Sequence, residues 1–341
     1  MIAGYEVTRT TRTARIAALI GAVVVALLIA APWWAGRADM RLLGEIFLYL
    51  SLASLWNLLA GYAGLVSVGQ QAFVGFGGYM LFALTIFGGL HPVAAIAIAT
   101  VAGALIAMPV AALIFRLRGA YFAIGTWVMA EVFRLSFAQI AALGGGSGSS
   151  LPPAIVRSLA EDRAGREAVS YWLILGAAVL VMATAYLFLR SRRGLALTAI
   201  RDNELAAASL GINIWRTKFF VYVVVGGLTS LIGALIFLQK LRISPDAAFS
   251  VNDWTAFVIF IVVIGGIGTV EGPIIGTLVF FLLRETLADL GTIYLIALGF
   301  VAIVVMLKAP KGVWGFVRDR FDIQLFPLGY RVRRAADSKG A

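Results

Sequence analysis

The chain has 341 residues, of which 61% are hydrophobic and only 13% are charged. This composition carries more apolar surface than one or two soluble domains bury, which excludes a soluble enzyme and indicates a membrane protein. The sequence has no Cys and a single His, His91, so it lacks the residues for disulfides, a thiolate nucleophile or a His/Cys metal cluster. We therefore expect no catalytic residue, no metal and no other cofactor.

Ten apolar segments follow a basic N-terminal arm of residues 1–15, so the expected fold is an all-α polytopic membrane protein with about ten transmembrane helices. The first segment is longer than the apolar part of a usual signal sequence and is expected to be an uncleaved anchor. The transmembrane domain then covers 16–309, and a basic, aromatic tail, 310–341, has the composition of an amphipathic segment at lipid headgroups. The predicted spans run over about 16–34, 42–60, 72–87, 93–115, 120–143, 169–189, 219–238, 254–264, 273–290 and 292–307.

The distribution of positive charge predicts the direction of these spans. With the N-terminus inside, 19 of the 28 Lys and Arg residues lie on the cytoplasmic side, 7 lie in outer loops and 2 lie within spans. The positive-inside rule therefore predicts that both termini are cytoplasmic. The net charge of +11 is then an orientation signal and does not indicate nucleic-acid binding. The two longest polar interruptions become an outer loop, 144–168, and a cytoplasmic loop, 190–218.

The cytoplasmic loop contains a short predicted helix. Asp202 is a suitable N-cap, the Ala-rich stretch after Glu204 favours a helix, and Gly211 can end it in the left-handed conformation. The spacing alone supports two interpretations of this helix equally well. It is either a simple connector or an element against which a soluble motor domain pushes.

The same stretch resembles the coupling loop of ABC importer permeases, in which an E-A-A motif precedes a glycine. Here Glu204 to Ala207 precedes Gly211, and the flanking residues resemble those of the branched-chain amino acid permeases, as do 57–79, 117–124 and 265–273. The resemblance covers roughly 57–326, and several motifs in one order are more specific than any single motif. One departure follows the fifth span, where the family's T-G-G-x-x-G-L pattern is replaced by L-G-G-G-S-G-S at 143–149.

The resemblance implies a LivM-like permease subunit that carries branched-chain or related amino acids across the bacterial cytoplasmic (inner) membrane. It implies a homologous second permease subunit, two cytoplasmic ATP-binding subunits and a periplasmic substrate-binding protein as partners. None of the five lysines follows a glycine, so the chain has no phosphate-binding loop of its own and ATP hydrolysis is expected in partner subunits. The residues implied in ATPase coupling are Arg201, Asp202, Asn203, Glu204, Ala207 and Gly211.

Two glycine clusters, at 61–78 and 265–276, are poorly suited to plain helices. They predict helix breaks, close helix packing or backbone that lines a cavity, and close packing alone is as well supported as a transport path. Polar side chains in and beside these clusters favour a path, because they are costly when they face lipid. The candidate path residues are Asn57, Ser67, Gln70, Gln71 and Gly268.

Two further sets of charges fall inside predicted spans. Glu131 and Arg134 are three residues apart in the fifth span and share one helix face. An isolated charge at that depth costs several kcal/mol, so we expect them to pair, and a structural ion pair is favoured over a proton relay. Arg284, with Glu285 and Asp289 in the ninth span, poses the same choice, and there contacts with a second permease subunit or a docked binding protein are favoured.

Three other functions remain open at this point. Permeases for urea or short amides have similar sequences. An ion-coupled secondary transporter could use Glu131 as its proton carrier, although this leaves the helix at 204–211 unexplained. A purely scaffolding role is also compatible with the sequence.

Overall fold

The structure is a computed structural model that describes residues 5–8, 12–287, 293–309, 311–321, 325–327 and 331–334. Parts of the predicted spans 273–290 and 292–307 and of the tail 310–341 therefore lie outside the described residues. The described chain is dominated by helices, and these overlap the predicted apolar segments wherever the segments are described, some segments covering two helical elements.

The first half of the chain forms an N-terminal helix and four long helices. Their bounds are α1 Arg12–Ile29, α2 Ala31–Trp34, α3 Arg37–Asn57, α4 Gln70–Ile86, α5 Pro92–Ile114 and α6 Ala120–Ala138. A π-helical turn, η1 Leu58–Tyr62, extends α3, and the short 3-10 turns η2 Ala141–Leu143 and η3 Gly145–Ser147 follow α6. The strand β2 Ser149–Ser150 and the helix α7 Pro153–Arg157 complete this half.

The second half contains the remaining long helices and the helical part of the tail. Its main helices are α8 Arg163–Arg190, α9 Arg192–Asp202, α10 Glu204–Ser209, α11 Ile214–Lys240, α13 Phe257–Gly265, α14 Gly272–Leu287, α15 Ile293–Lys308 and α16 Gly312–Phe321. Between α11 and α13 lie the strand β3 Arg242–Ile243, the helix α12 Pro245–Ala248 and the π-helical turn η4 Asn252–Ala256.

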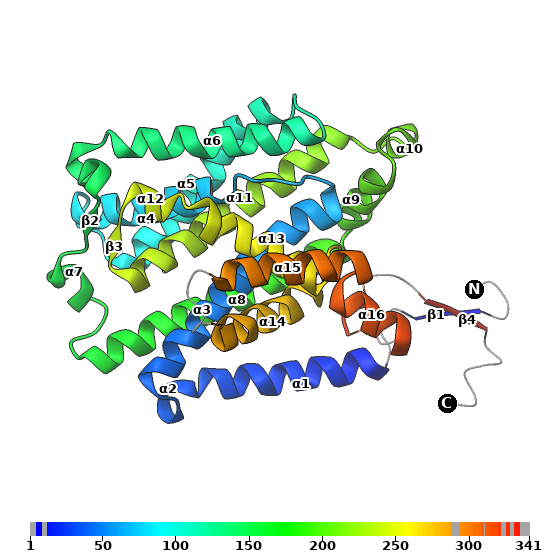
Figure 1. Cartoon of the computed structure of the whole chain (residues 1–341), viewed down its shortest axis with the longest axis horizontal. Helices are drawn as coiled ribbons and strands as arrows, with labels where there is room; N and C mark the ends of the chain where they lie inside the picture. Colours follow the sequence, from blue (N-terminus) through cyan, green and yellow to red (C-terminus); the bar gives the residue numbers. More distant parts are fainter. Residues whose placement is uncertain are drawn as a thin grey trace.

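The long helices pack side by side, with α6 along one side of the bundle and α1 along the opposite side (Figure 1). One end of the bundle carries α7 and the strand pair β2–β3. The other end carries α9, α10 and a second strand pair, β1 Tyr5–Thr8 with β4 Arg331–Arg334 (Figure 1). The two small antiparallel strand pairs are a departure from the all-α prediction, because hydropathy carries no signal for strands of two to four residues.

Among the residues that the structure describes, six helical segments are long and apolar enough to cross a membrane, or seven if α6 and the turns after it count as one bent span. The break between them bends the chain by 86°. The helices α1, α4 and α14 have 18, 17 and 16 residues, slightly fewer than the roughly 20 that a straight crossing needs. An all-α polytopic membrane protein is therefore the architecture that these helices support.

The centre of the bundle is formed where α11 crosses α4 and α5. A Cβ atom at Gly77 would overlap the carbonyl of Ser230, and one at Gly233 would overlap the carbonyl of Val74. Glycine at these crossings lets the backbones approach closely, as small residues do in membrane helix pairs. Within the first glycine cluster, Gly77 thus serves close packing, whereas the residues near Gly64 and Gly69 form an irregular connection between η1 and α4.

Candidate coupling and translocation sites

The predicted coupling loop folds into two helices, α9 and α10, that meet at Asn203. The side-chain oxygen of Asn203 accepts a hydrogen bond from the amide of Ala206 at 3.0 Å, so Asn203 is the N-cap of α10. The prediction of Asp202 as the cap was wrong by one residue, because Asp202 ends α9 and its carboxylate instead pairs with Arg201 at 2.9 Å. Asn and Asp are nearly equal N-cap formers, so composition alone could not choose between them.

The helix α10 presents apolar side chains to the surroundings at the end of the bundle. Leu205 and Leu210 are 82% and 79% exposed, whereas Ala207 is buried against the chain. The carboxylate of Glu204 pairs with Lys218 in the first turn of α11. Gly211 has a φ of +79°, the left-handed conformation predicted for it, and this turn leads the chain into α11.

Arg201 connects this coupling segment to the end of α3. Its Nη1 donates a hydrogen bond of 2.8 Å to the carbonyl of Gly61, which lies in the π-helical turn η1. The sequence placed Arg201 in the coupling group, but a bond across 140 residues to the first glycine cluster has no local sequence signal.

Asn57 binds the second glycine cluster from the same end of α3. Its Nδ2 donates to the carbonyl of Thr269 at 2.7 Å, and its Oδ1 accepts from the amide of Gly268 at 2.8 Å. The side chain of Asn57 is buried, so both bonds lie inside the protein. A side-chain amide that bonds a backbone N–H and C=O in this way fixes the conformation of the turn between α13 and α14.

Asn57, Gly61, Arg201, Gly268 and Thr269 together form one cluster, which we name the glycine junction. A Cβ atom at Gly61 would overlap Oδ1 of Asn57 and would lie 2.6 Å from the amide nitrogen of Gly268. Only glycine therefore fits at position 61 while the two bonds of Asn57 are kept. The structure thus unites residues that the sequence had assigned to two sites, coupling and transport path.

Glu271 adds a contact that sequence analysis missed. This buried carboxylate accepts the backbone amides of Leu325 and Phe326 at 3.2 and 2.9 Å, so part of the tail is held against the turn that contains the glycine junction. The position of Glu271 directly after a glycine-rich stretch was the one local feature that marked it. Its partners lie more than 50 residues further along the chain, so no sequence pattern indicated them.

The other candidate path residues lie apart from the junction, on the connection into α4. Ser67, Gln70 and Gln71 are buried. Gln70 donates to the carbonyl of Leu52 at 2.9 Å, and Gln71 donates to the carbonyl of Val68 at 3.1 Å and accepts from the hydroxyl of Thr255. In this conformation these side chains join neighbouring elements of the bundle.

A small cavity of about 10 Å³ touches Ser67, Gln70 and Thr229. Within the described part of the chain, Oε1 of Gln70 and the hydroxyl of Thr229 have no hydrogen-bond partner. A space of this size has room for about one water molecule, and unpaired buried polar atoms are the usual partners of such a water. The role of these residues as path lining stays a prediction.

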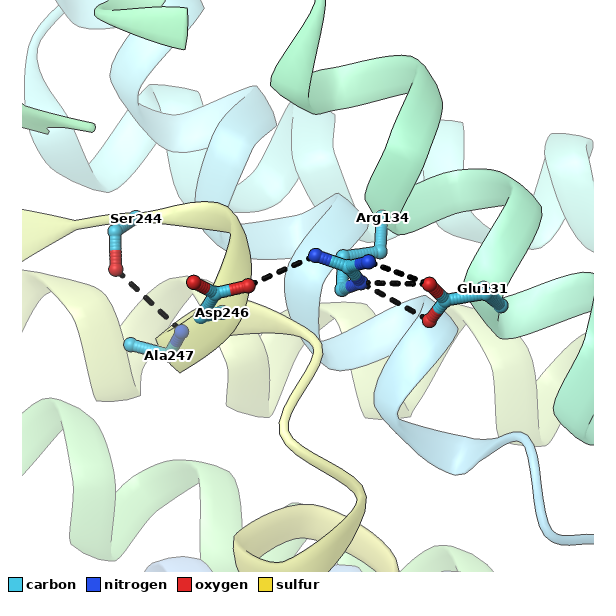
Figure 2. A network of polar contacts seen from close by, with 5 residues as sticks. All are labelled: Glu131, Arg134, Ser244, Asp246 and Ala247. Carbon is cyan, nitrogen blue, oxygen red and sulfur yellow. Dashed lines mark hydrogen bonds and ion pairs between the residues drawn. The ribbon is translucent and has the colours of Figure 1, made fainter. Parts of the chain in front are cut away.

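Glu131 and Arg134 form a close ion pair on α6, with Nη2 of Arg134 2.6 Å from the carboxylate. In Figure 2 the guanidinium of Arg134 lies between the carboxylates of Glu131 and Asp246. Its Nη1 is 2.8 Å from the carboxylate of Asp246, which belongs to α12. Asp246 was not singled out in the sequence, since it lies 112 residues away. The three charges join α6 to α12 near the end of the bundle that is opposite to α10 (Figure 1).

Arg284 is paired within its own chain, and its contact with another protein stays a prediction; Asp289 lies outside the described residues. The two terminal nitrogens of Arg284 bond both carboxylate oxygens of Glu45 at 2.7 and 2.9 Å, which ties α14 to α3. This forked geometry is the strongest form of an Arg–carboxylate contact. Among the residues described, no group of three or more His, Asp or Glu side chains is arranged to hold a metal ion.

Comparison with known proteins identifies a family for most of the chain. Residues 40–309 match the family model described as the permease component of the branched-chain amino acid transport system. The chain is 28% identical to the high-affinity branched-chain amino acid transport system permease protein LivM of Escherichia coli K12, over 88% of this chain and 76% of that protein. The corresponding LivM of Salmonella typhimurium is 26% identical over 90% of this chain and 76% of its own length.

A more distant relative is the probable branched-chain amino acid transport permease protein LivM of Methanocaldococcus jannaschii. It is 28% identical over 42% of this chain and 41% of its own length. No solved structure matches the chain.

Proposed function

The chain belongs to the family of branched-chain amino acid permease components, and from this premise we propose that it is one permease subunit of an ATP-driven importer. As a LivM-like member of that family, it is a multi-pass membrane component of transport and not an enzyme. The proposed cargo is a branched-chain or related amino acid, carried across the bacterial inner membrane by alternating access.

The proposed partners are a homologous second permease subunit, two cytoplasmic ATP-binding subunits and a periplasmic substrate-binding protein. The resemblance of the coupling loop and the names of the relatives support this assembly. The exposed leucines of α10 add physical support, because apolar side chains that project from the end of a polar helix are typical of a protein interface.

The observation that carries the proposal is the hydrogen bond from Arg201 to Gly61. It joins the end of the coupling segment to the glycine junction, where α3 changes to a π-helical turn and α13 ends. A displacement of α10 by an ATPase would therefore act directly on two helix breaks inside the membrane domain. A connector without a coupling role has no need of such a bond.

We also propose ten spans with both termini in the cytoplasm. The helices α9 and α10 and the strand pair β1–β4 lie at one end of the bundle, and α7 lies at the other (Figure 1). An even number of crossings is consistent with strands near both termini at the coupling end. In this orientation the pair Glu131–Arg134 and Asp246 lies near the outer side.

We retain Asn57, Ser67, Gln70, Gln71 and Gly268 as the proposed translocation path. The support is that the non-helical connection 64–69 and the turn after α13 interrupt apolar helices, and that irregular backbone within a membrane is tolerated only inside protein or beside water. The one-water cavity beside Gln70 would then widen in another state of the transport cycle.

The test is uptake by the complex reconstituted in proteoliposomes with its ATP-binding subunits and binding protein. Labelled branched-chain amino acids, urea and short amides are supplied separately, with ATP inside or with a proton gradient alone. We expect ATP-dependent uptake of a branched-chain amino acid. Uptake of urea or an amide alone would reassign the substrate, and uptake driven by the proton gradient without ATP would refute the importer.

The coupling bond is tested by Arg201→Gln, which removes the charged donor to Gly61 while keeping a polar side chain. We expect ATP hydrolysis to continue and the number of substrate molecules imported per ATP to fall at least about fivefold. The matched control is Arg192→Gln on the first turn of α9. An equal ratio in wild type and Arg201→Gln would show that the bond has no coupling role.

A further inference from the structure

A second site lies at the end of the bundle opposite to α10. It is a pocket of about 420 Å³ between the N-terminal ends of α3 and α8, the C-terminal end of α11 and the segment after α7. Pockets of 300 to 1,000 Å³ are the usual size for small ligands or for the head of a larger one. None of the residues assigned to coupling or to the translocation path lines it.

The lining of this pocket carries more positive than negative charge. Arg37, Arg41, Arg163 and Arg166 line it, and Glu167 is its one acidic lining residue. The carboxylate of Glu167 lies 3.3 Å from Arg41, 3.4 Å from Arg163 and 3.6 Å from Arg37, so three guanidinium groups share one acceptor. The side chains of these three arginines are 60% to 66% exposed, and each guanidinium has more N–H donors than the one carboxylate that they share can accept.

Three neighbouring acids, Asp39, Glu161 and Asp162, do not line the pocket. Asp39 accepts the backbone amide of Gly36 at 3.1 Å, and Asp162 accepts that of Gly165 at 2.8 Å. Both carboxylates are thus occupied as caps of helix N-termini. Arg166 in turn donates to the carbonyls of Ala160 and Glu161 at 3.2 and 2.8 Å, which holds its guanidinium beside the pocket.

The lining also has an apolar part, formed by Met40, Leu159 and Leu238 with the ring of Tyr171. A ligand that matches both parts of the lining carries an anionic group at one end and a hydrocarbon chain at the other. Arginine clusters suit phosphate in particular, because the planar guanidinium binds two phosphate oxygens at once.

Tryptophans place the pocket at the boundary between membrane and water. The rings of Trp33 and Trp172 lie 5.8 Å apart, and the exposed fractions of Trp33 and Trp34 are 74% and 65%. Trp172 and Tyr171, adjacent on α8, donate to the carbonyls at the end of α1 at 3.0 and 2.9 Å. Exposed tryptophans gather at the headgroup level of membrane proteins, so the pocket lies at the same level.

We propose that this pocket binds the phosphate of a phospholipid, with an acyl chain along the apolar part of its lining. The lipid belongs to the outer leaflet, an assignment that rests on the orientation proposed above, whereas binding itself does not depend on the transport function. A free phosphate offers the same anionic chemistry without the chain, and an acidic patch of a partner protein is the competing occupant.

The test is native mass spectrometry of the delipidated, intact complex titrated with phosphatidylglycerol, phosphatidylcholine or inorganic phosphate. We expect the double variant Arg41→Ala/Arg163→Ala to bind phosphatidylglycerol at least about tenfold more weakly than wild type. The matched control, Arg116→Ala/Arg118→Ala, removes the same charge from an exposed loop at the other end and should leave binding unchanged.

A photoactivatable phosphatidylglycerol with a reactive acyl chain gives a second measurement on the unaltered chain. We expect adducts in the peptides that contain Leu159 and Leu238. Equal loss of lipid in both double variants, or no adduct at these peptides, would overturn the proposal. Inorganic phosphate that binds as tightly as the lipid would assign the pocket to a free anion, and loss of binding-protein docking with lipid binding intact would assign it to a protein.

Discussion

Replacing Asn57 by alanine tests whether this residue holds the glycine junction or lines an open path. The substitution removes both polar atoms, so the carbonyl of Thr269 and the amide of Gly268 each lose a bond, of 2.7 and 2.8 Å. A buried polar group left without a partner costs about 1–3 kcal/mol, so the two together cost about 2–6 kcal/mol. With an unfolding entropy of about 2.1 cal/mol/K per residue, 1 kcal/mol corresponds to roughly 1–2 °C for a chain of 341 residues, so the midpoint of thermal unfolding should fall by at least about 3 °C.

The assay is thermal unfolding of the purified complex in detergent, followed by uptake in proteoliposomes. Ser51→Ala is the matched control at another buried polar position of α3, because its hydroxyl donates to the carbonyl of Phe47 one turn earlier. Ser51→Ala should lower the free energy of unfolding by less than about 1 kcal/mol, since the carbonyl of Phe47 still accepts its backbone hydrogen bond within the helix. If Asn57→Ala and Ser51→Ala unfold at the same temperature and only uptake differs, Asn57 lines the path, and the role of its two hydrogen bonds in holding the glycine junction is refuted.

Three further predictions concern coupling, charge and topology. Gly211→Val should weaken ATPase association and abolish uptake while membrane insertion persists, because a φ of +79° costs a β-branched residue roughly 1 kcal/mol or more; full ATPase co-purification with full uptake would contradict this. Glu131→Gln should keep a substantial part of ATP-driven uptake, because the amide still accepts a hydrogen bond; complete loss in a well-assembled complex would favour a proton relay. Single-cysteine variants should be labelled from the cytoplasm at Asn213 and from outside at Ser150, and labelling of both from one side would overturn the topology.

The helical, membrane-spanning character of the chain could be predicted from the sequence because hydropathy is a local property, whereas the count of ten spans stays a prediction. The pair Glu131–Arg134 and the turn at Gly211 could be predicted for the same reason. An i,i+3 spacing and a glycine at the end of a helix are patterns of a few consecutive residues. The contacts of Asn57 and Arg284 could not be predicted, because their partners lie more than 200 residues away along the chain. Only the folded arrangement brings those partners together.

The path residues show a different limit of sequence reasoning. A glutamine in an apolar span avoids lipid either by facing water or by bonding a neighbouring helix, and both solutions have the same sequence pattern. Gln70 and Gln71 adopt the second solution here, with bonds to Leu52, Val68 and Thr255. Glycine is equally ambiguous, since it permits both a helix break near Gly64 and the close helix crossing further along.

The strength of the bond between Arg201 and Gly61 suits a coupling element. A hydrogen bond from a charged donor contributes about 1.5–3 kcal/mol, and partial exposure of the Arg201 side chain, at 37%, reduces this toward the lower end. Coupling free energies between distant sites are typically 1–3 kcal/mol. The bond is therefore strong enough to carry a displacement of α10 into the glycine junction, and weak enough to break and re-form within each transport cycle. A buried ion pair at the same place would resist that exchange, because separating it leaves an uncompensated charge that costs about 3–5 kcal/mol.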